Sequence, residues 1–561
     1  MSQQAAEPRG HSADAAHPRT FEPSMVVVLV ITSILGAIIG IQILTTLGVT
    51  PNTAIIGVLV AIALSRIPLA ALKKFRSVHR QNLVQSNIST ATFVAANSLL
   101  LPIAIPWVMG RPELVWPLLI GAAAAALIDF LMLYWMFDSR VFPGKEAWPP
   151  GLAAAEAIKA GDRGGRRAGL LGIGTLVGII GSAIGVPMSA FGVAFIGNIV
   201  ALTMFGVGLL IRGYSMPIAG IDINAMYIPH GFMIGAGIVA LFQAVWTIVG
   251  RRKATAHAVA TGAKTSELSR VIEEGEVAPP VVVDRGELTR SEEAVKMALT
   301  RGAVLYAIAA AVLAVVSGLL AEMGIGMLIL WVLFATFACI AAEFIVGLSA
   351  MHSGWFPAFA TALIFLSLAL IVGFPPVAVA LVTGFIAAGG PAFADAGYDF
   401  KTGWILRRHE SRAMEIEGRK QQFFAGVVGM AVALAVVAIA HPMYFANEQF
   451  PPVAKVFVAT IQAGVDPALI TTLALWAIPG AIIQAIGGPK RQMGILLATG
   501  MLISNPAAGW AVLVGIALRI LYTRLRKDKD AAESEMTIAA AGFIAGDALW
   551  SFGNSMYKLV K

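Results

Sequence analysis

The chain has 561 residues, of which 58% are hydrophobic and 13% charged, and its formal net charge is +8. Soluble domains have about 45–50% apolar and about 25% charged residues, so this composition, with a mean hydropathy of +0.80, predicts an integral membrane protein. It leaves no room for a large soluble catalytic domain, and the single cysteine, Cys339, excludes an intramolecular disulfide and a CxxC metal site.

The first half of the chain alternates hydrophobic blocks with basic loops. Residues 1–24 are polar and lack a cleavage pattern, so we expect a disordered cytoplasmic tail there rather than a signal peptide. Blocks long enough to cross a bilayer follow it, and with a basic stretch at about 138–167 they make up a first transmembrane half, 25–250. These blocks lie at about 25–47, 52–72, 84–109, 114–137, 168–188, 190–212 and 228–249.

The stretch GYSMPIAGIDINAMYIPHG, between the last two of these blocks, is neither clearly a span nor clearly a loop. We expect a broken or re-entrant helix here, because Gly, Pro, Asp and Asn at membrane depth require protein or a water-filled cavity to satisfy the backbone. An ordinary extracellular loop of the same composition is the alternative. The stretch supplies five candidate substrate-binding residues: Tyr214, Asp222, Asn224, Tyr227 and His230.

The second half repeats the pattern of the first. A polar segment of mixed charge, 251–299, is expected to be a solvated cytoplasmic linker, and a second transmembrane half occupies 300–561. Its first four blocks precede a basic stretch at about 394–422, while prolines make 444–523 ambiguous. The sequence therefore predicts an all-α polytopic membrane protein with about 14–16 transmembrane helices in two similar halves, including broken or re-entrant helices. Basic loops face the cytoplasm, which places 73–80, 138–167, 394–422 and 524–528 on that side.

Ionisable side chains within apolar stretches are costly, and each is a functional hypothesis. Proton coupling needs a carboxyl group that can hold and release a proton near neutral pH. The candidates are Glu343, Asp547 and Asp129, with Glu343 ranked first because it lies far from any polar flank. For each, a hydrogen-bonded side chain that only fixes helix packing is the alternative.

Four further polar residues are candidates for substrate binding. His352 and Ser353 follow Glu343 and are expected between two spans, where unwound backbone could bind a peptide-like ligand. Asn82 and Gln85 lie one helical turn apart, and either line a pathway or join helices by hydrogen bonds. The chain has no GxxxxGK[ST] loop, no HExxH helix and no recognisable nucleophile-and-base set, so we expect neither ATP hydrolysis nor an enzyme.

Five stretches, in chain order, resemble segments of the oligopeptide transporter (OPT) superfamily, which includes the yellow-stripe-like metal–chelate transporters. They are QNLVQSNISTATFVAANSLLLPIAIPW (81–107), WPPGLAAAEAIKAG (148–161), MYIPHGFMIGAG (226–237), YDFKTGWILRRHESRAMEIEGRKQQFFAG (398–426) and AAGFIAGDALW (540–550). The chain departs from the family at Asp547, where glutamate is usual, at Pro150, and at Pro229 and His230. GLSAMHSGWFPAF (347–359) also lacks the family's Asn-Pro.

The resemblance implies a bacterial member related to the yellow-stripe-like branch, in the inner (plasma) membrane. It implies a secondary active transporter that takes up short peptides or peptide-like compounds with protons. Uptake of metal–chelate or siderophore complexes is an alternative within the same fold, and a passive channel or a membrane-embedded enzyme are alternatives from other classes. The expected partners are a small-molecule substrate, protons and the lipid bilayer, and a homodimer is left open. We expect no nucleic acid, metal or cofactor.

Overall fold

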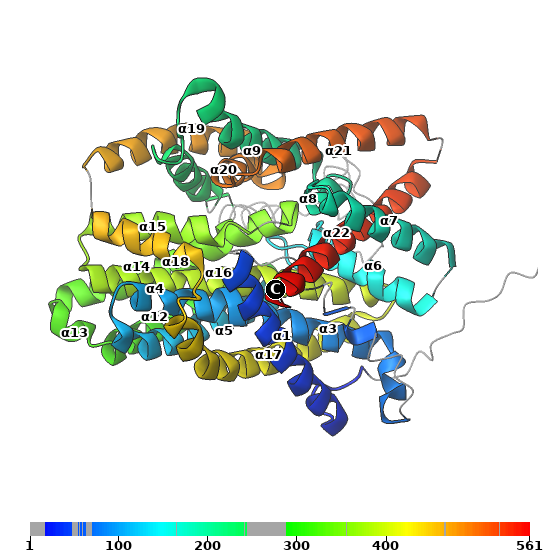
Figure 1. The fold of residues 1–561 in the computed structure, drawn as a ribbon, viewed down its shortest axis with the longest axis horizontal. Coiled ribbons are helices and arrows are strands. Elements are labelled where there is room, and N and C mark those ends of the chain that lie inside the picture. Colours follow the sequence, from blue (N-terminus) through cyan, green and yellow to red (C-terminus); the bar gives the residue numbers. More distant parts are fainter. Residues whose placement is uncertain are drawn as a thin grey trace, which may run out of the picture.

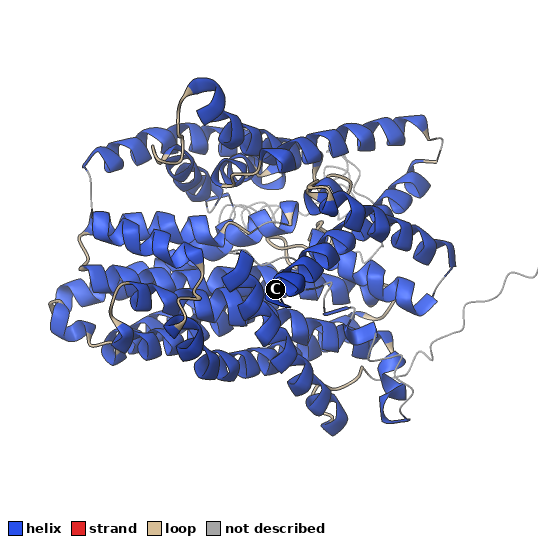
Figure 2. Ribbon diagram, viewed as in Figure 1, coloured by secondary structure: helices blue, strands red, loops and turns tan. Residues whose placement is uncertain are grey.

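The computed structural model describes most of the chain. It covers residues 17–47, 70–163, 165–240, 288–354, 356–464, 467–526 and 528–560, with 54, 57, 58, 60–62, 242 and 243. Every regular element within these residues is a helix, as Figure 2 shows, which confirms the all-α class. In the part of the chain that the structure describes, ten helices are long and apolar enough to cross a membrane, and five shorter apolar helices have 10–17 residues. The block expected at 52–72 lies largely outside the described residues, and within them the long and the shorter apolar helices together match the predicted number of spans.

The N-terminal elements include one long span with an internal change of helix type. They are α1 (Pro23–Leu47), η1 (Ala70–Arg76), α3 (Val78–Phe93), η2 (Val94–Leu100), α4 (Leu101–Val108), η3 (Pro112–Leu114) and α5 (Val115–Met136). η2 is a π-helical stretch that joins α3 and α4 into one continuous span. Leu101 donates its N–H to the Ala96 carbonyl at the end of this stretch, and Pro102, which has no N–H, follows.

The next elements differ from the predicted blocks. They are α6 (Pro149–Arg163), α7 (Gly165–Ala183), α8 (Met188–Val193) and α9 (Ile199–Ala219). The single span expected at 190–212 is instead divided into α8 and α9, because the Asn198 side chain caps α9 by accepting the N–H of Ala201 at 3.1 Å. Gly185, with a φ of +87°, makes the turn between α7 and α8.

The stretch in which we expected a broken or re-entrant helix is a helix end followed by a turn. α9 continues through it to Ala219 and ends at Gly220, whose φ is +67°. A turn follows, and an apolar helix then runs over Ile228–Ala240. This arrangement corresponds to the alternative interpretation, a loop between two helices.

The central elements begin the second half. They are α12 (Glu292–Val316), α13 (Leu319–Glu322), α14 (Ile325–Ser353), α15 (Ala358–Val372), α16 (Pro376–Leu406) and α17 (Arg412–Ala446). The polar loop expected at 394–422 is wrong: only a short turn separates α16 from α17. Several charged residues of this stretch lie within α16 and α17, where they are buried and find partners elsewhere in the structure, as described below.

The C-terminal elements show how the prolines of 444–523 are used. They are α18 (Pro452–Ala463), α19 (Pro467–Arg491), α20 (Met493–Leu502), α21 (Pro506–Leu525) and α22 (Lys529–Val560). Pro452, Pro467 and Pro506 each begin a helix, where the missing N–H would have no partner in the helix. α19 is kinked at Gly488, which has a φ of +68°.

Most long helices run along the horizontal axis of Figure 1, with α13 at the left margin and η1 and α6 towards the right. α16 is the central helix: the apolar window of its span is completely buried, and it packs against α3, α5, α14, α15 and α17. α7 packs along α22, and α9 packs against α20 and α21. Most of the predicted tail, 1–24, and of the predicted linker, 251–299, lies outside the described residues, but α1 begins inside that tail at Pro23 and α12 begins inside that linker at Glu292. Thr20, near the end of the predicted tail, is buried and bonded to Gln421 of α17.

Glycines allow α7 and α22 to approach each other closely. A Cβ at Gly178 would lie 2.6 Å from the carbonyl oxygen of Phe543, and one at Gly546 would lie 2.2 Å from that of Thr175. In lipid, small residues at such positions let two helix backbones come close enough to pack by van der Waals contacts. The backbones are in direct contact here, and this contact fixes the position of Asp547, the residue after Gly546.

Gly178→Ala is therefore expected to destabilise the protein by about 1–3 kcal/mol, because the new methyl group must push α22 away from α7. Gly172→Ala in the same helix is the matched control, since a Cβ there meets no atom within 4 Å. Both changes raise helix propensity equally. Thermal unfolding of the purified proteins measures the difference, and equal midpoints for the two variants would show that the contact is not tight.

Candidate functional site

Two of the predicted proton-coupling residues meet in the core. Asp129 of α5 and Glu343 of α14 are 1% and 0% exposed, and their carboxyl groups lie within hydrogen-bonding distance of each other. The Tyr306 hydroxyl of α12 donates to Glu343 Oε1 at 2.5 Å. Asp129 Oδ2 lies against Gly389 of α16, where a Cβ would be only 2.1 Å away. Four helices thus enclose one pair of acids.

This pair requires a proton. Two buried carboxylates in contact cannot both be ionised, because their repulsion adds to the cost of burying each charge. Asp129 Oδ1 and Glu343 Oε2 receive no hydrogen bond from any N–H or O–H donor of the described residues. A proton held between the two acids would satisfy these oxygens. The arrangement can therefore bind one proton and release it when its surroundings change.

A second acidic pair was missed from the sequence. Asp395 and Asp399 lie one turn apart on α16 and are 1% and 0% exposed. Ser89 donates to Asp395 Oδ1 at 2.7 Å, Gln85 to Asp399 Oδ1 at 2.6 Å, and Thr90 to Asp399 Oδ2 at 3.2 Å. The polar face of α3 thus holds the acids of α16. Their spacing of four residues is the signal that could have placed both acids on one helix face.

Asn82 also faces α16, and it belongs to a buried ionic network. Arg407 donates to Asn82 Oδ1 at 3.3 Å, to Gln422 Oε1 at 2.8 Å and to Glu415 Oε2 at 2.9 Å. Arg419 contacts the other Glu415 oxygen at 3.1 Å. All these side chains are at most 1% exposed. Asn82 and Gln85 therefore join helices in this structure, and whether they also meet substrate stays a prediction.

His352 and Ser353 lie at the C-terminal end of α14, which Gly354 closes with a φ of +73°. His352 is 3% exposed, neither ring nitrogen has a hydrogen-bond partner among the described residues, and Nδ1 is 4.0 Å from Glu146 Oε2. The Ser353 hydroxyl donates to the Ser349 carbonyl at 2.8 Å. His352 is thus a buried imidazole with unused hydrogen-bonding capacity. Its predicted role in substrate binding is not tested by these contacts.

The other predicted substrate residues lie apart from the acid pairs. Tyr214 is 38% exposed and accepts a hydrogen bond from Trp510, whereas His230 is 2% exposed. Asp222 lies in the turn after α9, where the N–H groups of Ala225 and Asn224, and then Arg212, hold the pKa of its carboxyl below the usual value. In the described residues, this turn reaches neither the acid pairs nor the Asp547 cavity described next.

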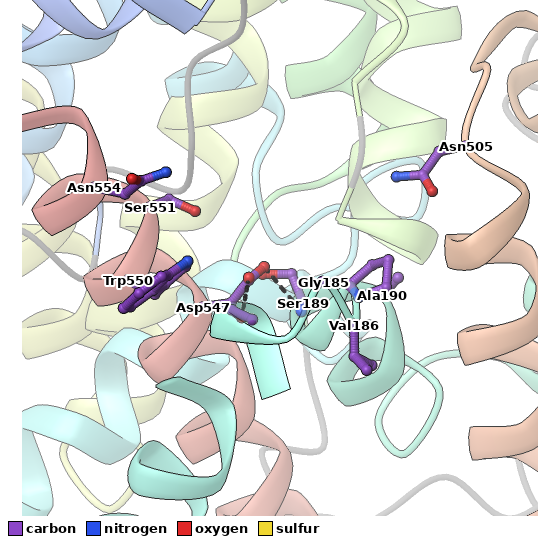
Figure 3. A pocket seen from close by; sticks show the side chains of 11 residues that line it. Gly185, Val186, Ser189, Ala190, Asn505, Asp547, Trp550, Ser551 and Asn554 are labelled. Carbon is purple, nitrogen blue, oxygen red and sulfur yellow. Dashed lines mark hydrogen bonds between the residues drawn. The ribbon is translucent and has the colours of Figure 1, made fainter. Parts of the chain in front are cut away.

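Asp547 faces a cavity of about 330 Å³ at the break between α7 and α8. Its carboxylate accepts hydrogen bonds from the Ser182 hydroxyl at 2.5 Å and the Ser189 N–H at 3.0 Å. Figure 3 shows Asp547 between the α7–α8 turn and α22, with Asn505 across the cavity. As far as the described residues go, the lining contains one carboxylate, no cationic side chain, one tryptophan, two amides and three hydroxyls; these residues are Ser182, Gly185, Val186, Pro187, Ser189, Ala190, Asn505, Asp547, Trp550, Ser551 and Asn554.

The cavity has the character of a small-molecule site. Such sites typically have about 300–1,000 Å³, a largely apolar wall and a few well-placed polar groups, and in transporters they often form where a helix is interrupted. Asn505 accepts the N–H of Ala508 through its oxygen, so its NH₂ group is the part left to meet a ligand. A positively charged group suits Asp547, and amide-bearing ligands suit the asparagines. Neither Asp129 nor Glu343 is among the described residues that line this cavity, so Asp547 lies apart from the other two predicted proton-coupling residues.

The family model described as OPT oligopeptide transporter protein matches residues 22–221 and 218–558, almost the whole chain. No curated protein matches the chain. The family match includes the helices that carry both acid pairs, the ionic network and the Asp547 cavity. With its long apolar helices, the chain is a multi-pass membrane protein, and it belongs to the OPT oligopeptide transporter family.

Proposed function

We propose that the protein is a secondary active transporter of the plasma membrane that takes up short peptides or peptide-like compounds together with protons. The observation that carries this proposal is the contact between Asp129 and Glu343 inside four helices. A proton must be held there, and the pair is enclosed in this structure. The proton exchanges when the surrounding helices move apart, as alternating access requires.

The Asp547 cavity is the proposed substrate site. A peptide has a positively charged amino terminus, which would pair with the carboxylate of Asp547, and the Trp550 ring, which lines the same cavity, would add a cation–π contact. The amides of Asn505 and Asn554 would meet the peptide bonds. The cavity would thus meet two requirements of a peptide carrier. Asp547 would recognise the charged amino terminus, and the two asparagines would form hydrogen bonds with the peptide bonds.

Reconstituted protein tests the proposal. In liposomes with an acidic exterior, we expect labelled di- to hexapeptides to accumulate above equilibrium, and the accumulation to collapse with a protonophore. A passive channel would only equilibrate the peptide. A metal–chelate carrier would accumulate the chelate and not the peptide, and either result would contradict the proposal.

Asp547→Asn tests the substrate site in the same assay. We expect the KM for peptides with a free amino terminus to rise about tenfold or more, the factor lost with one charge-assisted hydrogen bond, and the preference over N-acetylated peptides to disappear. Asp528→Asn is the matched control, because Asp528 caps the exposed start of the same helix and asparagine caps equally well. An unchanged preference in Asp547→Asn would remove this residue from the substrate site.

A further inference from the structure

A second cavity, of about 270 Å³, lies between the end of α5 and the start of α12. Among the described residues, its lining combines two guanidinium groups with two aromatic rings and contains no carboxylate; these residues are Tyr134, Trp135, Arg290, Ala294, Met297, Ala298 and Arg301. The proposed transport function uses none of these residues. The charge and shape of this cavity require their own explanation.

The position of Arg290 is fixed before any ligand binds. Its N–H donates to the Asp138 carbonyl at 3.2 Å, and the neighbouring Thr289 hydroxyl donates to Asp138 Oδ2 at 2.7 Å. The guanidinium carbon lies 5.3 Å from the centre of the Tyr134 ring, and Nη2 is 3.4 Å from the Tyr134 carbonyl. These contacts hold the charged group at the cavity.

The charge of Arg290 is incompletely satisfied. Its Nε is buried and has no hydrogen-bond partner among the described residues. Burial, and then the charge of Arg419, lower the pKa of the Arg290 guanidinium. Arg301 adds a second guanidinium, with its central carbon 5.8 Å from the Trp135 ring centre. A desolvated cation beside a second cation is stabilised by an anion that can accept several hydrogen bonds.

The cavity opens where the membrane surface should lie. α12 begins beside the stretch that follows α5, where Arg140 pairs with Glu292 and the Asp138 carbonyl accepts the N–H of Arg290, and this stretch belongs to one of the predicted basic loops, 138–167. Short basic segments mark the cytoplasmic side. Met297 in the lining is 48% exposed, and Val304 and Ile308, one and two turns beyond Arg301, are 55% and 56% exposed. An apolar, outward-facing surface thus continues from the cavity along α12.

We propose that this cavity binds the phosphate group of an anionic phospholipid from the cytoplasmic leaflet. The headgroup phosphate would lie between Arg290 and Arg301, and an acyl chain would follow the apolar face of α12. Tyrosine and tryptophan are the rings enriched at headgroup depth, and basic cavities between spanning helices suit anionic lipids. Free inorganic phosphate has the same charged oxygens but no acyl chain. An experiment that compares phospholipid with free phosphate can therefore tell which of the two ligands binds.

Native mass spectrometry of the intact protein, with added phosphatidylglycerol or phosphatidylcholine, tests this proposal. We expect the wild-type protein to retain one phosphatidylglycerol molecule, and Arg301→Gln to retain at least about fivefold less, because one of two charge-assisted contacts is lost. Lys296→Gln is the matched control: it removes the same charge from the same helix, outside the cavity lining. Arg290→Gln with Arg301→Gln should abolish retention, and Arg301→Gln alone suffices if the double variant fails to fold.

Thermal unfolding with inorganic phosphate distinguishes the two sources. We expect phosphatidylglycerol, and not millimolar phosphate, to raise the unfolding midpoint of the wild-type protein and of Lys296→Gln. Stabilisation by phosphate alone would assign the cavity to a soluble anion and overturn the lipid proposal. Equal retention of phosphatidylcholine, or equal loss in Arg301→Gln and Lys296→Gln, would also overturn it. None of these measurements depends on peptide transport.

Discussion

Glu415→Ala is expected to destabilise the protein by about 3–5 kcal/mol, the cost of leaving buried charges without their partner. Glu415 is completely buried, and its two oxygens bind Arg407 and Arg419, which are 0% and 1% exposed. Removal of the carboxylate leaves two guanidinium groups facing each other in the core. A loss of this size removes a large part of the stability of an ordinary domain, so we expect little folded protein in the membrane.

The control is two residues away on the same helix. Glu417 is 43% exposed and pairs with Lys420 at 3.5 Å, so Glu417→Ala should change stability by less than about 0.5 kcal/mol. Yield after solubilisation and the thermal unfolding midpoint are the measurements. Arg407→Met with Glu415→Leu and Arg419→Met should recover part of the loss, because apolar side chains of similar volume can replace a buried ionic group. Equal behaviour of Glu415→Ala and Glu417→Ala would show that the network contributes little.

The class of fold could be predicted from the sequence, because a membrane span is recognised from the hydrophobicity of its own residues and requires no knowledge of contacts with other segments. Glu343 and Asp129 were identified for the same reason, since each is an isolated acid in an apolar run. Their contact could not be predicted. The two acids are far apart in the chain, and only the packing of α5, α12, α14 and α16 brings them together.

The residues of 394–422 show the opposite case. A stretch rich in arginine and glutamate is typical of a solvated loop when read alone, yet Arg407 and Arg419 are buried. Their partners lie elsewhere in the chain: Arg407 binds Asn82, and Arg419 donates to the Phe137 carbonyl at 2.7 Å. The hydrophobicity of a segment does not show whether its charged side chains are buried, because their hydrogen-bond partners come from segments far away in the chain.

Two of the stretches that resemble family segments contact each other in the structure. Residues 81–107 and 398–426 were singled out separately, and the structure pairs them. Gln85 binds Asp399, and Gln422 donates to the Ser86 hydroxyl at 2.9 Å and to the Asp399 carbonyl at 2.7 Å. Two polar motifs within apolar spans thus satisfy each other.

Glu343→Gln is expected to reduce proton-driven peptide uptake to the level of protein-free liposomes, while peptide exchange without a proton gradient continues. Glutamine keeps the shape of the side chain, can accept the Tyr306 hydroxyl and can donate to Asp129. It cannot take up or release a proton near neutral pH. This substitution preserves the packing of the side chain and removes one protonation site. A loss of uptake in the variant can therefore be assigned to lost proton coupling rather than to misfolding.

Three comparisons make this test decisive. Asp129→Asn should show the same loss of coupling, because both carboxyl groups form the proposed proton site. When either acid is replaced, the remaining carboxylate no longer faces a second carboxylate, and the repulsion that favours protonation is lost. Glu322→Gln, at an exposed position of α13, should keep full proton-driven uptake, since the Glu322 carboxylate pairs with Arg111 at the surface. Normal unfolding midpoints are required for each variant. Wild-type proton-driven uptake in Glu343→Gln would assign the buried pair to helix packing alone, and the coupling site would then lie elsewhere.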